Sequence, residues 1–309
     1  MLSEYPSRVM KSKRSSSAKA TATSSRKRRR AGPTSCSTAA AGASIQRLNH
    51  DSSFILTVGR LRLAVDPWLV GAEIDGSALF NSAQHVKACA SPSDLGHLDA
   101  ILLSLPFSDH THEETLALLS PDIPIYAQRE AALRVKRDPR LKSRTVYVLS
   151  SDETLRFPGS NVVFRSVPTS GILDFTHGGL MIETDTERYL YAPHGLLLNG
   201  PTASCLDLEK TSSKRLVALM ITCSSYRVPL ILGGTVNLGL EAACEVALAL
   251  KPEFLIDIHS ERKIAHGLIP LVSPSSYHTS REIARYLKKR GVGSELISLS
   301  SLSSSHPLL

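Results

Sequence analysis

The stretch of residues 99–119, with the sequence DAILLSLPFSDHTHEETLALL, decides how the rest of the chain is interpreted. The apolar run Ile101–Leu103 predicts a short buried strand, and a helical pattern follows the polar residues after it. Those polar residues include Asp109, His110 and His112, an Asp-His-x-His sequence. A loop after a buried strand often holds a metal ligand or a catalytic base, because the strand fixes the side chains and the loop exposes them. The motif by itself is equally typical of a coincidental surface loop.

Length and composition indicate a globular chain. The 309 residues, 42% of them hydrophobic, provide material for one large domain or two small ones. No apolar run of about 18 residues occurs, so no membrane-spanning helix is predicted. The five cysteines are scattered and odd in number, with no C-x-x-C pair and no secretory h-region at the N-terminus. We therefore expect free thiols in a reducing compartment.

The positive charge of the chain is concentrated at its N-terminus. The chain has 36 Lys and Arg residues and 28 Asp and Glu residues. Residues 1–45 contain ten of the basic residues and one of the acidic residues, so 26 basic and 27 acidic residues lie beyond them. The remainder of the chain has no basic excess, which argues against a nucleic-acid-binding domain.

Residues 1–45 are rich in Ser, Ala and Arg and are predicted to be a disordered tail. Their acid-poor composition slightly favours a transit peptide for a chloroplast or mitochondrion. The cluster Arg26–Arg30 also fits a nuclear localisation signal, and a solvated tail on a cytoplasmic protein is the third interpretation. The domain itself is expected at 46–300, with a Ser-rich tail at 301–309.

Hydrophobic periodicity predicts an α/β domain. Ser53–Val58 and Leu61–Asp66 are β-rich runs separated by Gly59-Arg60, a hairpin signal. Further strands are predicted at 101–103, 123–127, 144–149, 161–167, 178–183, 188–192, 216–221, 254–258 and 295–299, and helices after 113 and at 128–137, 241–250 and 278–289. Residues 72–98 are predicted to be loop with one short helix. Hairpins followed by strand–helix alternation, and then the same again, favour two packed sheets with helices outside.

Four predicted strands end in residues that can bind a metal. Asp66 ends the first, Asp109 and His110 follow the second, His194 follows the third and His259 follows the fourth. One such strand end is ordinary, whereas four in one domain indicate a shared site. The other seven histidines belong to no motif and are interpreted as surface or loop residues.

This arrangement resembles the metallo-β-lactamase-fold superfamily, specifically its lactonase-like branch and that branch's plant and cyanobacterial relatives. Phe54–Gly71 looks like the opening hairpin that ends in the first-motif aspartate, and Ser104–His112 looks like the H-x-H-x-D-H metal loop. Tyr191–His194 falls where the family has a strand ending in Gly-Asp, and Ile256–His259 looks like the strand that ends in the last metal ligand. The resemblance implies a four-layer α/β/β/α sandwich.

The departures from the family pattern are informative. Leu105 and Phe107 stand where the first two histidines of the motif belong, no histidine occurs at 167–170, and His194 replaces the bridging aspartate. The resemblance therefore implies that the first metal site is absent. The family ligands of the second site map to Asp109, His110, His194 and His259, a set acceptable to Zn²⁺, the favoured ion, or Fe²⁺.

Two further roles are predicted around this mononuclear site. Asp66 would orient a ligand histidine, and His112 would serve as a proton shuttle or an extra ligand. Arg262, Lys263 and Asn199 are candidate transition-state donors, for which a solvated surface position is favoured.

The function implied is a metal-dependent hydrolase of an unidentified small molecule, an ester, lactone or phosphodiester. The alternative is a catalytically inactive binding or scaffold protein that keeps the fold without a metal.

Overall fold

The computed structural model describes residues 42–169, 174, 176–206, 213–299, 302 and 305–308. They belong to the unit of residues 40–309, to which the following account applies. The predicted basic tail lies outside the described residues, apart from its last few positions.

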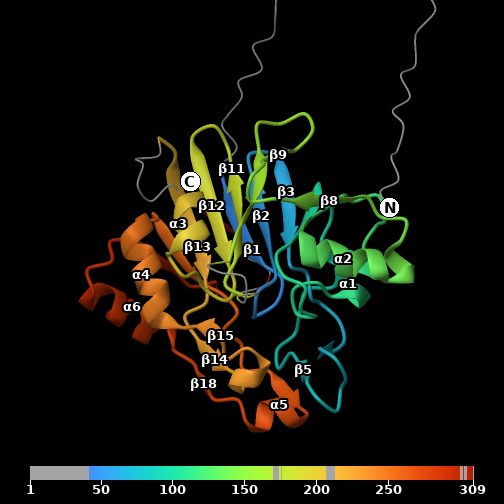
Figure 1. The fold of residues 1–309 in the computed structure, drawn as a ribbon. Helices are drawn as coiled ribbons and strands as arrows, with labels where there is room; N and C mark the ends of the chain where they lie inside the picture. Colours follow the sequence, from blue (N-terminus) through green and yellow to red (C-terminus); the bar gives the residue numbers. More distant parts are fainter. Residues whose placement is uncertain are drawn as a thin grey trace, which may run out of the picture. The chain divides into compact units, whose positions relative to one another are not determined.

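The first of two large sheets has seven strands (Figure 1). Their order is β20 (Ser305–Pro307), β1 (Ser44–Arg47), β2 (Phe54–Val58), β3 (Leu61–Val65), β6 (Ala100–Leu103), β7 (Ile125–Gln128) and β8 (Val146–Leu149). The expected hairpin joins β2 to β3 through Gly59, whose φ of +60° suits glycine. Strands β3, β6, β7 and β8 run parallel.

The edge of this sheet includes residues that the sequence assigned to the two tails. Strand β1 begins at Ser44, and β20 pairs with it antiparallel. Ile45 and Leu308 are 0% and 1% exposed, because both side chains enter the core between the large sheets. A pairing between the two ends of the domain leaves no local signal in a short Ser-rich segment.

The second large sheet also has seven strands. Their order is β19 (Glu295–Ile297), β16 (Phe254–Asp257), β13 (Arg215–Ile221), β12 (Glu187–Ala192), β11 (Gly179–Glu183), β10 (Val163–Val167) and β9 (Leu155–Arg156). Strands β12, β13, β16 and β19 run parallel. The predicted strands of this half are therefore confirmed.

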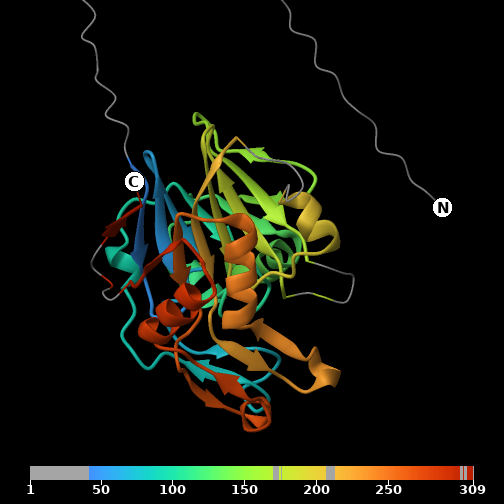
Figure 2. The same ribbon diagram turned by 90° about the vertical axis from the view of Figure 1, so that its left-hand side faces the viewer.

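Three apolar clusters define four layers (Figures 1 and 2). Side chains such as Phe54 and Tyr191 fill the space between the two sheets. Ile101 and Val135 join the first sheet to α2, while Leu219 and Ile283 join the second sheet to α6. The α-helices are α1 (Glu113–Leu118), α2 (Arg129–Arg137), α3 (Gly200–Cys205), α4 (Leu240–Leu250), α5 (Leu268–Leu271) and α6 (Ser280–Lys289). The predicted α/β/β/α sandwich is confirmed.

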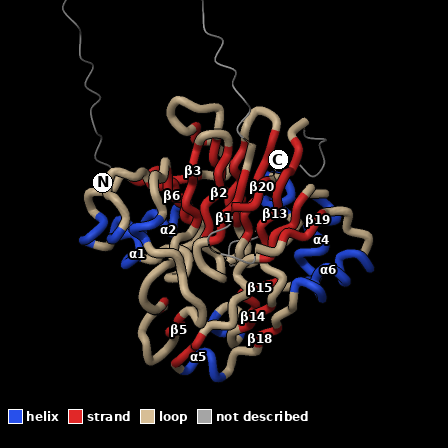
Figure 3. The backbone as a smooth tube through the Cα atoms, turned by 180° about the vertical axis from the view of Figure 1, so that it is seen from behind, coloured by secondary structure: helices blue, strands red, loops and turns tan. Residues whose placement is uncertain are grey.

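Two small three-stranded sheets lie at one end of the large sheets (Figure 3). One contains β15 (Thr235–Leu238), β14 (Ser225–Arg227) and β18 (Ser275–Ser276), and the other contains β17 (Ile264–His266), β5 (Ser82–Gln84) and β4 (Glu73–Ile74). Short 3₁₀ turns occur at η1 (Pro92–Asp94), η2 (Pro139–Leu141) and η3 (Leu230–Leu232). The prediction of only loop and helix for 72–98 is wrong, because β5 pairs with the distant β17, which no local pattern indicates. No helix in the described part of the chain is long and apolar enough to cross a membrane.

Candidate metal centre

The four strand ends singled out in the sequence meet at one place. Asp109 and His110 lie in the loop after β6, His194 follows β12 and His259 follows β16. One ligand atom from each of these four residues lies within 4.8 Å of the others, and all four residues are buried. They meet because the carboxyl ends of parallel strands share one edge of each sheet. Together they form the cluster that we call the His/Asp cluster.

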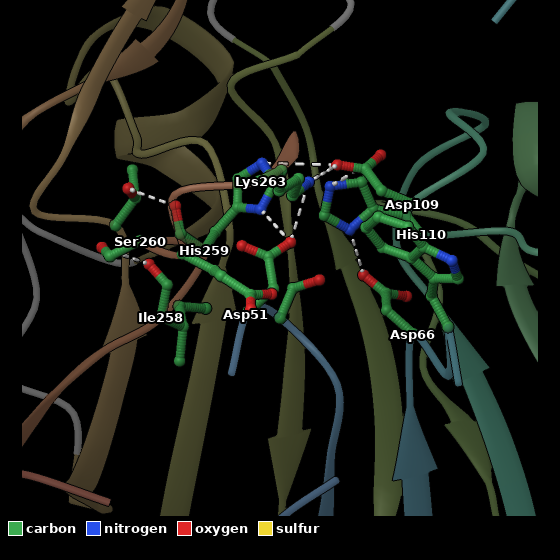
Figure 4. Close-up of polar contacts among 12 residues, drawn as sticks. Asp51, Asp66, Asp109, His110, Ile258, His259, Ser260 and Lys263 are labelled. Atoms are coloured by element: carbon green, nitrogen blue, oxygen red, sulfur yellow. Dashed lines mark hydrogen bonds and ion pairs between the residues drawn. The ribbon is translucent and has the colours of Figure 1, made fainter. Parts of the chain in front are cut away.

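Asp66, at the end of β3, holds His110 in a fixed orientation (Figure 4). Its Oδ2 atom lies 2.7 Å from Nδ1 of His110 and also accepts hydrogen bonds from the hydroxyls of Tyr191, at 2.7 Å, and Ser104. Its Oδ1 atom accepts the backbone N–H of Ser104 at 2.8 Å. A proton held on Nδ1 leaves the Nε2 lone pair of His110 facing the cluster, which is how carboxylates prepare histidines for metal binding.

The hydroxyl of Tyr191 should contribute measurably to stability through this carboxylate. We expect Tyr191→Phe to lower the free energy of unfolding in urea by about 1.5–3 kcal/mol, because a buried charged group loses a donor. Tyr189→Phe is the matched control: its hydroxyl donates at 2.7 Å to Glu187, whose carboxylate is 18% exposed, so that water can replace it. Equal losses for the two variants would contradict this account of Asp66.

Asp51 orients His259 in the same way as Asp66 orients His110. Its Oδ2 atom lies 2.8 Å from Nδ1 of His259, and its backbone carbonyl accepts the N–H of His259 at 3.0 Å. The Nε2 atom of His259 faces Asp109, 3.5 Å from its Oδ2. The sequence analysis missed Asp51. It lies in the loop between β1 and β2, 208 residues from its partner, and its only sequence signal is a polar segment between two buried strands.

Because a carboxylate binds Nδ1 in each case, both histidines direct their Nε2 atoms toward the His/Asp cluster. His259 and Asp66 also have left-handed backbones, with φ of +54° and +42°, which non-glycine residues adopt only when the surroundings hold them there. Such strain is concentrated at functional sites, and here it lies at two of the four strand ends.

His194 completes the set as a neutral imidazole. Its ring is stacked between those of Phe107, 5.7 Å away, and His259, 4.9 Å away. Its Nε2 atom lies 2.9 Å from Nε2 of His110, and its buried Nδ1 atom has no hydrogen-bond partner among the described residues. Burial, together with the charges of His259 and His110, holds the pKa of His194 well below its usual value.

The charges of Asp109 and His110 are interdependent. Burial alone would raise the pKa of Asp109, but His110 and Lys263 hold it well below its usual range. Burial likewise opposes protonation of His110, yet the Asp109 and Asp66 carboxylates raise its pKa to about 9. A proton on His110 can thus bridge the two Nε2 atoms of His110 and His194 when no cation lies between them.

The donor set fits a divalent ion. One carboxylate and three imidazoles, two of them oriented by outer carboxylates, are the ligands that Zn²⁺ and Fe²⁺ accept. The Nε2 atom of His194 lies 2.9 Å from that of His110, so both imidazoles direct a nitrogen toward the position that an ion would occupy.

Apolar side chains occupy the positions where the sequence lacks histidines. Leu105 is 1% exposed, and the ring of Phe107 lies against His194. Neither can donate an electron pair to a metal, and the single remodelled site stays a prediction.

His112 lies outside the His/Asp cluster. Its Nδ1 atom accepts the backbone N–H of Thr115 at 3.2 Å and so caps α1, and its Nε2 atom lies 3.4 Å from the carbonyl of Ala72. These contacts give His112 a structural role at the start of α1. Its role as a proton shuttle stays a prediction.

Lys263 belongs to the site, and its interpretation as a solvated surface residue is wrong. Its side chain is only 14% exposed, and its Nζ atom lies 3.0 Å from Asp51, 3.2 Å from Asp109 and 3.4 Å from Glu73. Burial alone would lower the pKa of Lys263, but these three carboxylates raise it well above its usual value. Burial raises the pKa of Glu73 to about 8, against the opposing effect of Lys263. The other two candidate donors, Arg262 and Asn199, are exposed.

Two histidines interpreted as surface or loop residues also prove to be buried. His85 stacks on Trp68 at 3.8 Å and pairs with Glu261 at 2.5 Å, so that it supports the wall behind Lys263. His177 is 7% exposed and pairs with Asp174 at 2.9 Å. Glu261, which is distant in the sequence, is the polar partner that allows His85 to be buried.

A large cavity of about 1680 Å³ opens over the His/Asp cluster. Asp109, His194 and His259 lie in its wall, and apolar side chains such as Phe80, Leu232 and Ile269 line it further out. Large apolar side chains close in sequence to these lining residues are exposed: Leu79 by 78%, Leu230 by 89%, Ile231 by 93% and Leu271 by 81%. The cavity thus combines a polar, metal-ligating floor with apolar walls.

Comparisons with known proteins identify the fold. No family model and no curated protein matches the sequence. A possible metal-dependent hydrolase from Veillonella parvula is similar in structure, with 14% identity, a TM-score of 0.62 and coverage of 86% of this chain and 100% of its own. The isothiocyanate hydrolase from Delia radicum gut bacteria has 18% identity, a TM-score of 0.59 and coverage of 85% and 98%.

A third similar structure is named for its fold. The metallo-β-lactamase fold protein YhfI from Bacillus subtilis has 13% identity, a TM-score of 0.54 and coverage of 85% of this chain and 99% of its own. The chain therefore has the metallo-β-lactamase fold that its sequence predicts. The lactonase-like branch within it stays a prediction.

Proposed function

We propose that this protein is a metal-dependent hydrolase with one divalent ion, Zn²⁺ or Fe²⁺, held by Asp109, His110, His194 and His259. The observation that carries the proposal is the pair of buried carboxylates, Asp51 and Asp66, each bonded to Nδ1 of a different histidine in the cluster. A fold that merely tolerated these histidines would have no need to orient two of them toward one point.

Such an ion would act as a Lewis acid. It would polarise a carbonyl or phosphoryl oxygen and lower the pKa of water at the site to about 7. The surrounding residues provide the rest. Asp66, bonded by Tyr191 and Ser104, keeps the proton on Nδ1 of His110, and the ring of Phe107 excludes water from one side of His194. These contacts preorganise the site before a substrate enters.

The cavity favours a substrate with an apolar body and a polar, hydrolysable group. The group would reach the floor at Asp109, and the body would contact walls such as Phe80 and Leu232. Carboxylic esters, lactones and phosphodiesters with this division of polarity form the class to be tested. We also keep the proposal that residues 1–45 direct the protein to an organelle.

Elemental analysis of purified protein tests the proposal. Under metal-replete conditions we expect one Zn or Fe ion per chain in the wild type and loss of that ion in His110→Ala and His259→Ala. His97→Ala, which removes an imidazole whose side chain is 79% exposed, is the control and should keep the ion. A wild type without bound metal would favour the alternative, a binding or scaffold protein. The replacement of motif histidines by Leu105 and Phe107 supports that alternative.

A further inference from the structure

The ammonium group of Lys263 lies among three carboxylates beside the His/Asp cluster. Figure 4 shows two of them, those of Asp51 and Asp109. The Nζ atom of Lys263 is 3.0 Å from Oδ2 of Asp51, 3.2 Å from Oδ2 of Asp109 and 3.4 Å from Oε2 of Glu73. An ammonium group has three N–H donors, and here three carboxylate oxygens accept them. Lys263 therefore has no donor left for a substrate, and the proposed role as a transition-state donor does not explain its position.

Three acidic side chains surround the single ammonium group of Lys263. Asp51 and Asp109 each serve two purposes, because Asp51 also orients His259 and Asp109 belongs to the His/Asp cluster. The second oxygen of Asp51, Oδ1, is buried and has no hydrogen-bond partner within the described residues. A buried carboxylate oxygen without a partner is costly, so the Asp51 carboxylate retains a free acceptor although its Oδ2 atom already serves His259 and Lys263.

The ammonium group of Lys263 also makes a cation–π contact. Its Nζ atom lies 4.8 Å from the ring centroid of Trp68, which is fully buried and stacked on His85. The loop that begins at His259 thus delivers both a cluster ligand and, four residues later, a cation to the same place.

We propose that Lys263 is a built-in cation that fills a second, all-oxygen cation position and so limits this centre to one metal ion. The position is formed by Asp51, Glu73 and Asp109 and differs in chemistry from the His/Asp cluster. Carboxylate oxygens alone suit a hard divalent ion such as Mn²⁺ or Mg²⁺, whereas the imidazole-rich cluster suits Zn²⁺. The inference rests on the proposed function, because the first ion is the one proposed there.

Replacing Lys263 by a neutral residue tests this inference through ion counts. We expect Lys263→Met, which keeps an unbranched side chain of similar length, to bind one Mn²⁺ more per chain than the wild type after dialysis against Zn²⁺ and Mn²⁺. The physical reason is that three converging carboxylates without a cation repel one another until they bind one or take up protons. Lys263→Gln, whose amide can still donate to these oxygens, is the second variant in case the first fails to fold.

Two further variants separate a charge effect from a structural one. Lys263→Arg keeps the positive charge and should match the wild-type ion count. Adding Glu73→Gln to Lys263→Met should abolish the extra Mn²⁺ while leaving the Zn²⁺ count unchanged. A folded Lys263→Met or Lys263→Gln with the wild-type Mn²⁺ count overturns the inference, as does a wild type that already binds the second ion.

The two proposals fail in different ways. A wild type without Zn or Fe removes the proposed function, whatever Lys263 does. The inference about Lys263 depends only on the difference in Mn²⁺ between the neutral variants and the wild type.

Discussion

Asp66→Asn is expected to weaken Zn²⁺ binding about 10- to 100-fold, the usual effect of removing a carboxylate that orients a metal-ligating histidine. In the wild type, Oδ2 accepts from Nδ1 of His110 and from the hydroxyls of Tyr191 and Ser104, and Oδ1 accepts a backbone N–H. An amide nitrogen in either position would face a donor. The proton on Nδ1 of His110 would lose its acceptor, and the Nε2 lone pair would no longer be directed at the cluster.

The dissociation constant can be measured by competition with a chromophoric Zn²⁺ chelator. Asp99→Asn is a matched control, because Asp99 also pairs with a histidine, at 3.1 Å, but that histidine, His97, is exposed. We expect its affinity to equal that of the wild type. An unchanged affinity in Asp66→Asn would mean that the Asp66–His110 pair serves only the folded structure.

Removing the metal is expected to lower the free energy of unfolding by about 4 kcal/mol when the free metal concentration has been about 1,000 times the dissociation constant. The expected loss follows from binding to the folded state alone. The proposed ligands also come from both large sheets: Asp109 and His110 follow β6 of the first sheet, whereas His194 and His259 follow β12 and β16 of the second. A bound ion would therefore link the two sheets at one edge.

Urea unfolding with and without a chelator measures this effect. The variant His110→Ala/His259→Ala should show no response to the chelator, since it lacks two of the four ligands. If the chelator leaves the free energy of unfolding of the wild type unchanged, metal does not contribute to its stability. An equal response in the double variant would assign the effect to metal bound elsewhere.

The sequence predicted most strands of the two large sheets and where they end, because both are local properties. Alternating and continuous apolar runs locate all of these strands except β1, β9 and β20, and the polar residues that terminate them include Asp66, Asp109, His110, His194 and His259. The replacement of motif histidines by Leu105 and Phe107 is also visible without a structure, and it already indicates that one metal site is absent.

Tertiary structure alone decided how these residues are supported. Asp51 reaches His259 across 208 residues, Tyr191 reaches Asp66 across 125, and Lys263 reaches Glu73 across 190. Such contacts carry no signal in local composition. Lys263 looks like a surface lysine in the sequence, and only the convergence of three carboxylates explains why it is nearly buried.

Residues 99–119 illustrate both contributions. The chain by itself determined that a buried strand opens into an Asp-His pair and lacks the two preceding histidines, because strand propensity and residue chemistry are local. It predicted His110 as a ligand and His112 as a proton shuttle or an extra ligand. The fold turns His110 toward Asp66 and His194, while His112 caps the helix that follows. Orientation depends on partners from distant strands, and only the packing of the two sheets brings those partners together.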